Sequence, residues 1–235
     1  NSNIVGFYNI LELCRKYEVK HLVYASSSSV YGANKSLPFK EDDPVNHPIS
    51  LYAASKRSNE LMAHSYSHLY GFACTGLRFF TVYGPWGRPD MAPMIFSKAI
   101  LEKDNIKLFN NGDMKRDFTF IEDAVEVLIR CIGKIATIDK KFNRLDPNPS
   151  TSFAAHRIFN VGNNKAINLI EFLTLLEKAL GTKAKIKNME LQPGDVQETL
   201  CDNKNLKDWI DFSPSTPIEK GIESFAKWYI KYRKK

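Results

Sequence analysis

The stretch HLVYASSSSVYG, residues 21–32, decides the fold class of this 235-residue chain. Apart from His21, its first five residues are continuously apolar, which is typical of a strand buried on both faces of a parallel sheet. The serines that follow, Ser26 to Ser29, are then expected at the carboxyl end of the strand. Open α/β sheets bind their ligands at that end, so the stretch also marks a candidate site.

Helical and strand patterns alternate along the rest of the chain. Helices are predicted over 4–17, 51–70, 169–180 and 218–232, and strands over 21–25, 74–81, 158–161 and 198–201. Between a Gly/Pro-rich loop at 83–89 and about Gly133, a helix, a strand and a helix are predicted in turn. Residues 33–49 hold prolines and other turn formers, and residues 134–157 lack any periodicity, so both indicate surface loops. This alternation predicts an α/β fold with a mostly parallel sheet covered by helices.

Composition excludes several classes of protein. Hydrophobic residues make up 43% of the chain and charged residues 25%, as in an ordinary globular protein. No apolar run approaches 18 residues, and the first residues lack the order of a signal peptide. The four cysteines are far apart in sequence, which favours reduced thiols in a cytosolic protein over a disulfide framework or a metal site. The formal net charge of +7 fits either a nucleic-acid surface or polyanionic ligands.

The strongest chemical signal is YAASK, residues 52–56. A four-residue separation on a helix puts Tyr52 and Lys56 on one face. A tyrosine hydroxyl is a poor base at neutral pH, but a nearby ammonium favours its ionised form. The pair is therefore suited to removing a proton from a substrate hydroxyl, which a strand-end serine can hydrogen-bond at the same time.

Seven segments, read in order, carry a family resemblance. They are ASSSSVYG (25–32), YAASK (52–56), LRFFTVYGP (77–85), KRDFTFIED (115–123), IFNVGN (158–163), QPGDV (192–196) and GIESFAKWY (221–229). Together they span nearly the whole chain, which resembles the nucleotide-sugar epimerases and dehydratases of the extended short-chain dehydrogenase/reductase family. The resemblance implies the C-terminal part of a Rossmann-like doubly wound parallel sheet, plus a smaller α/β substrate-binding domain. Residues 1–80 are expected in the NAD-binding domain and 81–235 mainly in the sugar-nucleotide domain, with 120–165 partly returning to the sheet.

The resemblance also implies roles for single residues. The catalytic residues it implies are Ser27, Tyr52 and Lys56. The NAD contacts it implies are Tyr52, Lys56, Ser26, Val82 and Asn3, although asparagine at the start of a helix also favours a cap. The substrate contacts it implies are Ser28, Thr81, Arg88, Arg116, Gln192 and Asp195. No metal is expected.

Two segments separate the reactions of the family. Ser28 and Ser29 stand where dehydratases carry an Asp-Glu pair, and hydroxyls cannot supply that acid and base. RFFT (78–81) and GRPDMA (87–92) resemble the UDP-glucuronate 4-epimerases. A hydroxyl at Thr81 and a guanidinium at Arg88 suit a sugar carboxylate.

The function expected from this resemblance is epimerisation at C4 of a UDP-hexuronic acid, through a transient 4-keto sugar with bound NAD. A neutral UDP-hexose 4-epimerase and a UDP-glucuronate decarboxylase stay open, since the decarboxylase shares the 4-keto intermediate. A relative that binds nucleotide or RNA through its basic surface is the non-enzymatic alternative. The resemblance also implies a homodimer through the helices near 4–17 and 51–70, with no nucleic-acid or membrane partner.

The family begins with a strand and G-x-x-G-x-x-G, whose backbone amides hold the NAD pyrophosphate. The twelve glycines of this chain do not include that spacing. The sequence therefore predicts the C-terminal part of a longer protein that has about three more βα units of roughly 30 residues each. The 235 residues alone are expected to be inactive and to retain little NAD.

Overall fold

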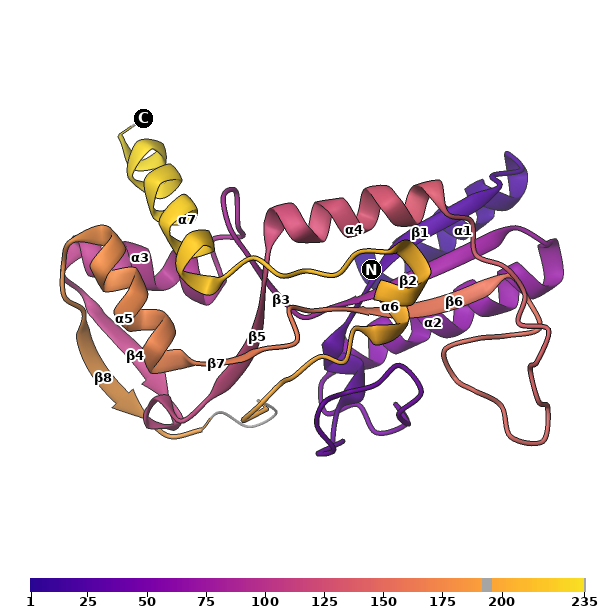
Figure 1. Cartoon of the computed structure of the whole chain (residues 1–235), viewed down its shortest axis with the longest axis horizontal. Coiled ribbons are helices and arrows are strands. Elements are labelled where there is room, and N and C mark those ends of the chain that lie inside the picture. The colour runs from indigo at the N-terminus through magenta and orange to yellow at the C-terminus, as the bar shows by residue number, and fades with distance from the viewer. Residues whose placement is uncertain (192–195, 235) are drawn as a thin grey trace. The chain divides into compact units, whose positions relative to one another are not determined.

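The computed structural model describes residues 1–191 and 196–234, and these fall into two compact units. The first unit comprises Asn1–Phe80, Val125–Val161 and Cys201–Ser213, and the second comprises Thr81–Ala124, Gly162–Leu200 and Pro214–Lys235. Figure 1 labels the helices and strands of both.

The first unit is built on a parallel sheet. Its strands, in spatial order, are β1 (His21–Ser27), β2 (Ala73–Phe79) and β6 (His156–Val161). In this register Ser26 of β1 lies beside Arg78 of β2, and Arg78 lies beside Asn160 of β6. The polar residues near the carboxyl ends of three strands are thereby aligned across the sheet.

Helices cover both faces of this sheet, as the figure indicates (Figure 1). Cys74 and Ile158 face the helices α1 (Phe7–Lys16) and α2 (Leu51–Tyr70), whose Leu11 and Ala63 belong to the same apolar cluster. Leu77, Phe159 and Val161 alternate with these strand residues and therefore face the other way. They pack with residues of α4 (Ile121–Gly133) and α6 (Lys204–Ile210), namely Val127, Cys131, Leu206 and Ile210. The expected α/β class with parallel strands is confirmed.

The bounds of α2 follow from its capping residues. The side chain of Ser50 accepts a hydrogen bond from the Ala53 backbone N–H at 3.1 Å, which begins the helix. Gly71, in the left-handed conformation with φ of 76°, ends it by donating its N–H to the Ser67 carbonyl. The helix predicted over 51–70 is confirmed at both ends, and its first turns carry Tyr52 and Lys56.

The second unit has its own small sheets and core. Its strands are β3 (Thr81–Tyr83), β5 (Lys115–Phe120) and β7 (Ala166–Asn168) in one sheet, and β4 (Asn105–Phe109) and β8 (Lys185–Met189) in another. Its helices are α3 (Ala92–Glu102), α5 (Leu169–Leu180) and α7 (Ile218–Arg233). The rings of Phe118 and Phe172 stack at 4.5 Å in the middle of this core. Short helical segments, η1 (Ser2–Gly6) and η2 (Ser28–Tyr31) in the first unit and η3 (Asn110–Gly112) in the second, complete the described elements.

Some predicted elements are wrong. The single strand expected over 74–81 is divided, because β2 ends at Phe79 and β3 begins at Thr81 in the second unit. The strand expected over 198–201 is absent from the described chain there, where only isolated bridges join Lys115 to Glu198 and Phe39 to Cys201. β7, β8 and α6 were not predicted. β8 gives no apolar signal because four of its five residues are exposed, and α6 has only seven residues.

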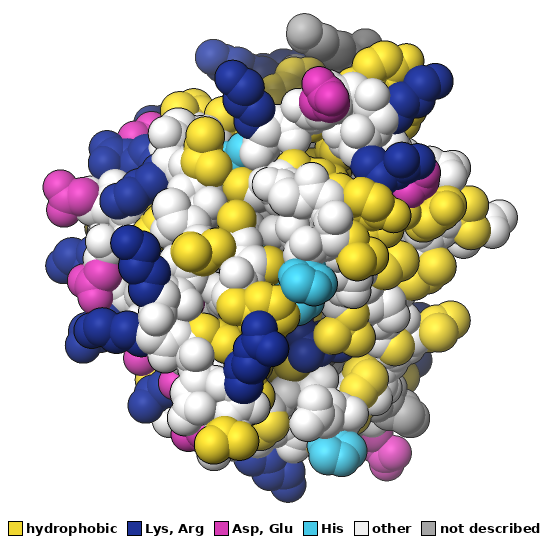
Figure 2. Space-filling model, turned by 90° about the vertical axis from the view of Figure 1, so that its right-hand side faces the viewer, with side chains coloured by type: hydrophobic (Ala, Val, Ile, Leu, Met, Phe, Trp, Pro, Cys, Tyr) yellow, Lys and Arg dark blue, Asp and Glu magenta, His cyan; other side chains and the backbone are white. Residues whose placement is uncertain are grey.

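None of the helices in the described residues is long and apolar enough to cross a membrane. The thiols of Cys14, Cys74 and Cys131 are buried, and burial raises the pKa of each. On the face that Figure 2 shows, Lys and Arg side chains are scattered among hydrophobic and polar ones and form no single stripe.

Candidate active site

Ser27 is held at the carboxyl end of a buried parallel strand. It is the last residue of β1 and caps the short helix η2, with 8% of its surface exposed. Its Oγ accepts a hydrogen bond from the Ser29 N–H at 3.2 Å and donates to the Ser29 Oγ at 3.1 Å. The cap fixes where the Ser27 hydroxyl lies, because strand and helix meet at this residue.

Lys56 is on α2, and its side chain extends to the end of β1. Its Nζ donates to the carbonyl oxygen of Ala25 at 3.0 Å and is 6.0 Å from the centre of the Tyr52 ring. Burial lowers the pKa of the Lys56 ammonium. Tyr52, one turn earlier, is 47% exposed, so its hydroxyl is accessible to a ligand. The helix thus presents a hydroxyl and a cation on one face beside the end of β1.

A buried ion pair that the sequence analysis missed adjoins this strand end. Glu60 of α2 and Arg78 of β2 are 1% and 0% exposed, and the carboxylate accepts from the guanidinium Nε at 2.9 Å. Ser26 donates to the same carboxylate at 2.6 Å. Although burial raises the pKa of the Glu60 carboxyl, Arg78, Ser26 and Arg57 together outweigh it, and the net pKa lies below its usual value. No local spacing signals a pair that forms between a helix and a strand 18 residues apart.

A cavity of about 250 Å³ opens beside Lys56. Its lining includes Asn3, Phe7, Tyr24, Ala25 and Asn59. The expectation that Asn3 caps its helix is wrong, because Asn3 lies inside η1 and its Nδ2 donates to the Ser55 Oγ at 3.0 Å. The lining thus combines an ammonium, two amide side chains and two aromatic rings.

Ser28 is the first residue of η2, in the first unit, and the remaining described site residues lie in the second unit. Thr81 and Val82 are on β3, and Thr81 pairs with Phe118 of β5, two residues after Arg116. The Arg116 guanidinium donates to the carbonyls of Lys115 and Gln197 at 3.0 and 3.1 Å.

Arg88 follows β3 in a loop, and its side chain is 70% exposed. It contacts Asp90 at 3.3 Å and the sulfur of Met91 at 3.3 Å. Gln192 and Asp195 lie outside the described residues. The first unit therefore gathers Asn3, Ser26, Ser27, Ser28, Tyr52 and Lys56, and the second gathers Thr81, Val82, Arg88 and Arg116.

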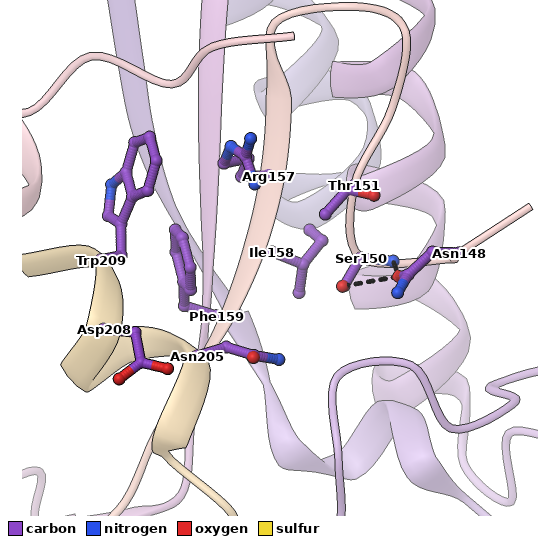
Figure 3. Close-up of a pocket in the computed structure, with 9 residues that line it drawn as sticks. All are labelled: Asn148, Ser150, Thr151, Arg157, Ile158, Phe159, Asn205, Asp208 and Trp209. Atoms are coloured by element: carbon purple, nitrogen blue, oxygen red, sulfur yellow. Dashed lines mark hydrogen bonds between the residues drawn. The ribbon is translucent and has the colours of Figure 1, made fainter. Parts of the chain in front are cut away.

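A second cavity, of about 260 Å³, lies along β6 and is drawn in Figure 3. There the Arg157 guanidinium lies 4.7 Å from the Trp209 ring, which stacks on Phe159 at 5.8 Å. It holds none of the predicted site residues. Across the described part of the chain, no three His, Cys, Asp or Glu side chains are grouped as metal ligands.

Comparison with known families identifies the chain. Residues 1–162 match the model of the "NAD dependent epimerase/dehydratase family", and this span contains Ser27, Tyr52 and Lys56. The chain belongs to this family. Membership in the NAD dependent epimerase/dehydratase family confirms the resemblance seen in the sequence and the expected cofactor, NAD.

Several members of the family are similar over nearly the entire chain. Protein CapI of Staphylococcus aureus is 52% identical over all of this chain and 70% of its own length. UDP-glucuronate 4-epimerase 3 of Arabidopsis thaliana is 43% identical over 99% of this chain and 54% of its own length. The crystal structure of UDP-glucuronic acid 4-epimerase from Bacillus cereus, in complex with UDP-glucuronic acid and NAD, matches with a TM-score of 0.84. That match has 28% identity and covers 98% of this chain and 68% of that one.

Proposed function

We propose that this protein epimerises a UDP-hexuronic acid at C4, interconverting UDP-glucuronate and UDP-galacturonate. The observation that carries the proposal is the grouping of Ser27, Tyr52 and Lys56 at the carboxyl end of β1. The relatives named UDP-glucuronate 4-epimerase support the choice of substrate. The coarser assignment, an NAD-dependent nucleotide-sugar epimerase, rests on the family itself.

Tyr52 acts as the general base in this proposal. Its hydroxyl takes the proton of the sugar 4-hydroxyl, and the Lys56 ammonium favours the ionised form that can do so. Ser27 donates or accepts a hydrogen bond at the same 4-hydroxyl and keeps it in line with Tyr52. Bound NAD supplies a reversible acceptor for the hydride that leaves C4.

Inversion follows when the 4-keto sugar turns over between the two half-reactions. Once a hydride has been returned to the opposite face of C4, Tyr52 gives its proton back to the C4 oxygen. NAD would not be consumed over the full cycle. Ser28 and Ser29 provide no acid–base pair for the loss of water, so the keto sugar is not dehydrated.

Thr81 and Arg88 are the residues we assign to the sugar carboxylate. The Arg88 side chain is 70% exposed and pairs only loosely with Asp90, so its guanidinium is accessible to an anion. A guanidinium binds a carboxylate through two parallel hydrogen bonds, which a neutral hexose cannot accept. Arg116 is assigned to the diphosphate on the same chemistry.

We also propose that the active form is a homodimer through α1 and α2. Apolar side chains on these helices are exposed, among them Tyr8, Leu51, Leu61 and Leu69 at 48%, 87%, 53% and 66%. Large exposed apolar residues gathered on two helices are typical of an interface between subunits.

The product of the reaction tests the proposal. The complete gene product is incubated with UDP-glucuronate, and the product is analysed by mass spectrometry and by NMR of the C4 configuration. A product of unchanged mass with inverted C4 is expected. Loss of carbon dioxide would establish the decarboxylase instead, and preference for UDP-glucose would establish the neutral hexose epimerase.

The non-enzymatic alternative is tested by binding. Salt-dependent RNA binding without turnover of any UDP-sugar would favour it. The scattered basic side chains on the face shown in Figure 2 provide no stripe along which a nucleic acid could lie.

A further inference from the structure

The carboxylate of Glu60 is the most heavily hydrogen-bonded group beside the proposed catalytic residues. It accepts from Arg78 at 2.9 and 3.1 Å, from Arg57 at 2.8 Å and from the Ser26 hydroxyl at 2.6 Å. Removing two such charges from water is costly, and apolar residues of similar volume often serve stability as well or better. The pair at Glu60 and Arg78 therefore calls for a role besides stability.

The pair joins α2 to the strand end at a second point. Lys56 Nζ already binds the carbonyl oxygen of Ala25, and Glu60 lies one turn further along the helix. Glu60 then holds Ser26, the next residue of β1. Two bonds one turn apart fix the helix against the strand in both position and rotation.

Arg78 contacts a residue that follows Ser27 in the chain, whereas Glu60 contacts the residue before it. Its Nη1 donates to the Tyr31 hydroxyl at 3.1 Å, and that hydroxyl donates to the Asn160 Oδ1 at 2.7 Å. Tyr31 is the last residue of η2, the helix that Ser27 begins. Tyr31 is 1% exposed, so this arm of the network is also shielded from water.

We infer that Glu60 and Arg78 are positioning residues, which act through Ser26 and Tyr31 to hold the Ser27 hydroxyl in register with Tyr52 and Lys56. The residue before Ser27 and the residue four after it are both attached to one buried pair. This inference rests on the proposed function, since it assigns Ser27 a task in the reaction. Moving a catalytic group by about 1 Å can lower the rate about 100-fold. We therefore expect kcat to depend on this network.

The test uses substitutions that keep the ion pair. Ser26→Ala and Tyr31→Phe each remove one hydroxyl and leave Glu60 and Arg78 paired. The matched control is Ser58→Ala, because among the described residues the Ser58 hydroxyl bonds the Ala54 carbonyl within α2 and none of the network groups. In the complete gene product, each network variant is expected to lower kcat for UDP-glucuronate about 10-fold with KM within about twofold, and the control is expected to change neither.

A double-mutant cycle separates positioning from general destabilisation. In a Ser27→Ala background, Ser26→Ala and Tyr31→Phe should cause no further loss of kcat, because the group they position is gone. The inference would be overturned if each substitution lowered kcat by the same factor with Ser27→Ala as without it. It would also be overturned if both single variants kept the kcat of the unmodified protein. If Ser26→Ala does not fold, the same double-mutant cycle can be measured with Tyr31→Phe and Ser27→Ala.

A second readout does not need turnover. The Ser29 amide donates a hydrogen bond to the Ser27 Oγ. Hydrogen exchange of this amide should accelerate about 10-fold in both network variants and stay unchanged in Ser58→Ala. Equal protection in all variants would contradict the inference. Inactivity of the unmodified protein on every UDP-sugar would remove the proposed function itself. An inactive Tyr52→Phe beside fully active Ser26→Ala and Tyr31→Phe variants would overturn the positioning role alone.

Discussion

Lys56 Nζ lies 3.0 Å from the carbonyl oxygen of Ala25, so the cation of the proposed site is anchored to the strand that ends at Ser27. This hydrogen bond fixes the position of the Lys56 ammonium. It leaves the positive charge in place, because a backbone carbonyl carries no net charge. Its charge is therefore available both to Tyr52 and to a ligand in the adjoining cavity.

Replacing this cation should move the pH dependence of the reaction as well as its rate. Lys56→Met is expected to lower kcat at pH 7 by about 100-fold and to recover part of the loss as the pH rises, because alkaline solution ionises a tyrosine without help. Steady-state kinetics between pH 6 and 10 provide the measurement. Lys20→Met, at an exposed lysine, is the control, and a loss that is equal at every pH would argue against this role.

Arg88 should govern the choice between charged and neutral sugars. Arg88→Ala is expected to lower kcat/KM for UDP-glucuronate by about 10- to 100-fold and to leave the value for UDP-glucose nearly unchanged, since only the uronate offers a carboxylate. Competition between the two substrates measures the ratio directly. Equal losses on both substrates would assign Arg88 to the shared nucleotide instead.

Breaking the buried ion pair should destabilise the first unit, because it leaves one charge buried without its partner. Glu60→Leu leaves Arg78 buried without its partner and is expected to reduce the free energy of unfolding by about 3–5 kcal/mol. Adding Arg78→Leu should recover part of that loss, because no unpaired charge is left. Urea unfolding of the single and double variants measures both. A double variant no more stable than Glu60→Leu would contradict this expectation.

His156 should make the protein less stable in mild acid. It is 4% exposed, it bonds the Tyr24 hydroxyl at 3.0 Å, and burial together with the nearby His64 lowers its pKa to about 3. The unfolded chain binds a proton at this residue below about pH 6.5 and the folded chain does not, so stability falls as pH decreases from there toward 3.

Replacing His156 isolates its share of this pH dependence. In His156→Gln, the slope of the unfolding free energy against pH between 6 and 5 should decrease by about 1 kcal/mol per pH unit. Burial also lowers the pKa values of His64 and His21. In His156→Gln the unfolding free energy should therefore still rise with pH, but with a smaller slope. Thermal or urea unfolding at several pH values gives the slope, and an unchanged slope would show that His156 is protonated in the folded protein.

Local patterns predicted those parts of the fold that local physics determines. Ser50 and Gly71 are both good capping residues, and the helix between them has the predicted bounds. β8 could not be found, because KIKNM is mostly exposed and is a strand only through its pairing with β4. Asn3 has the residue type of a cap, but its contact with Ser55 of another helix decides its place.

The proposed site divides in the same way. Tyr52 and Lys56 are four apart on one helix, so their shared face follows from spacing alone. Ser26, Glu60 and Arg78 belong to three elements, and their hydrogen bonds arise only when the sheet register sets Ser26 beside Arg78. Long-range pairing of this kind has no signature in a single sequence.

The most direct test of the central claim is the turnover of UDP-glucuronate by the complete gene product and its Tyr52→Phe variant. Tyr70→Phe is the matched control, since Tyr70 lies on the same helix and is 48% exposed against 47% for Tyr52. We expect Tyr52→Phe to lower kcat by about 10²- to 10⁴-fold and Tyr70→Phe to stay within about twofold of the unmodified protein. Turnover by Tyr52→Phe at the rate of the unmodified protein would contradict it.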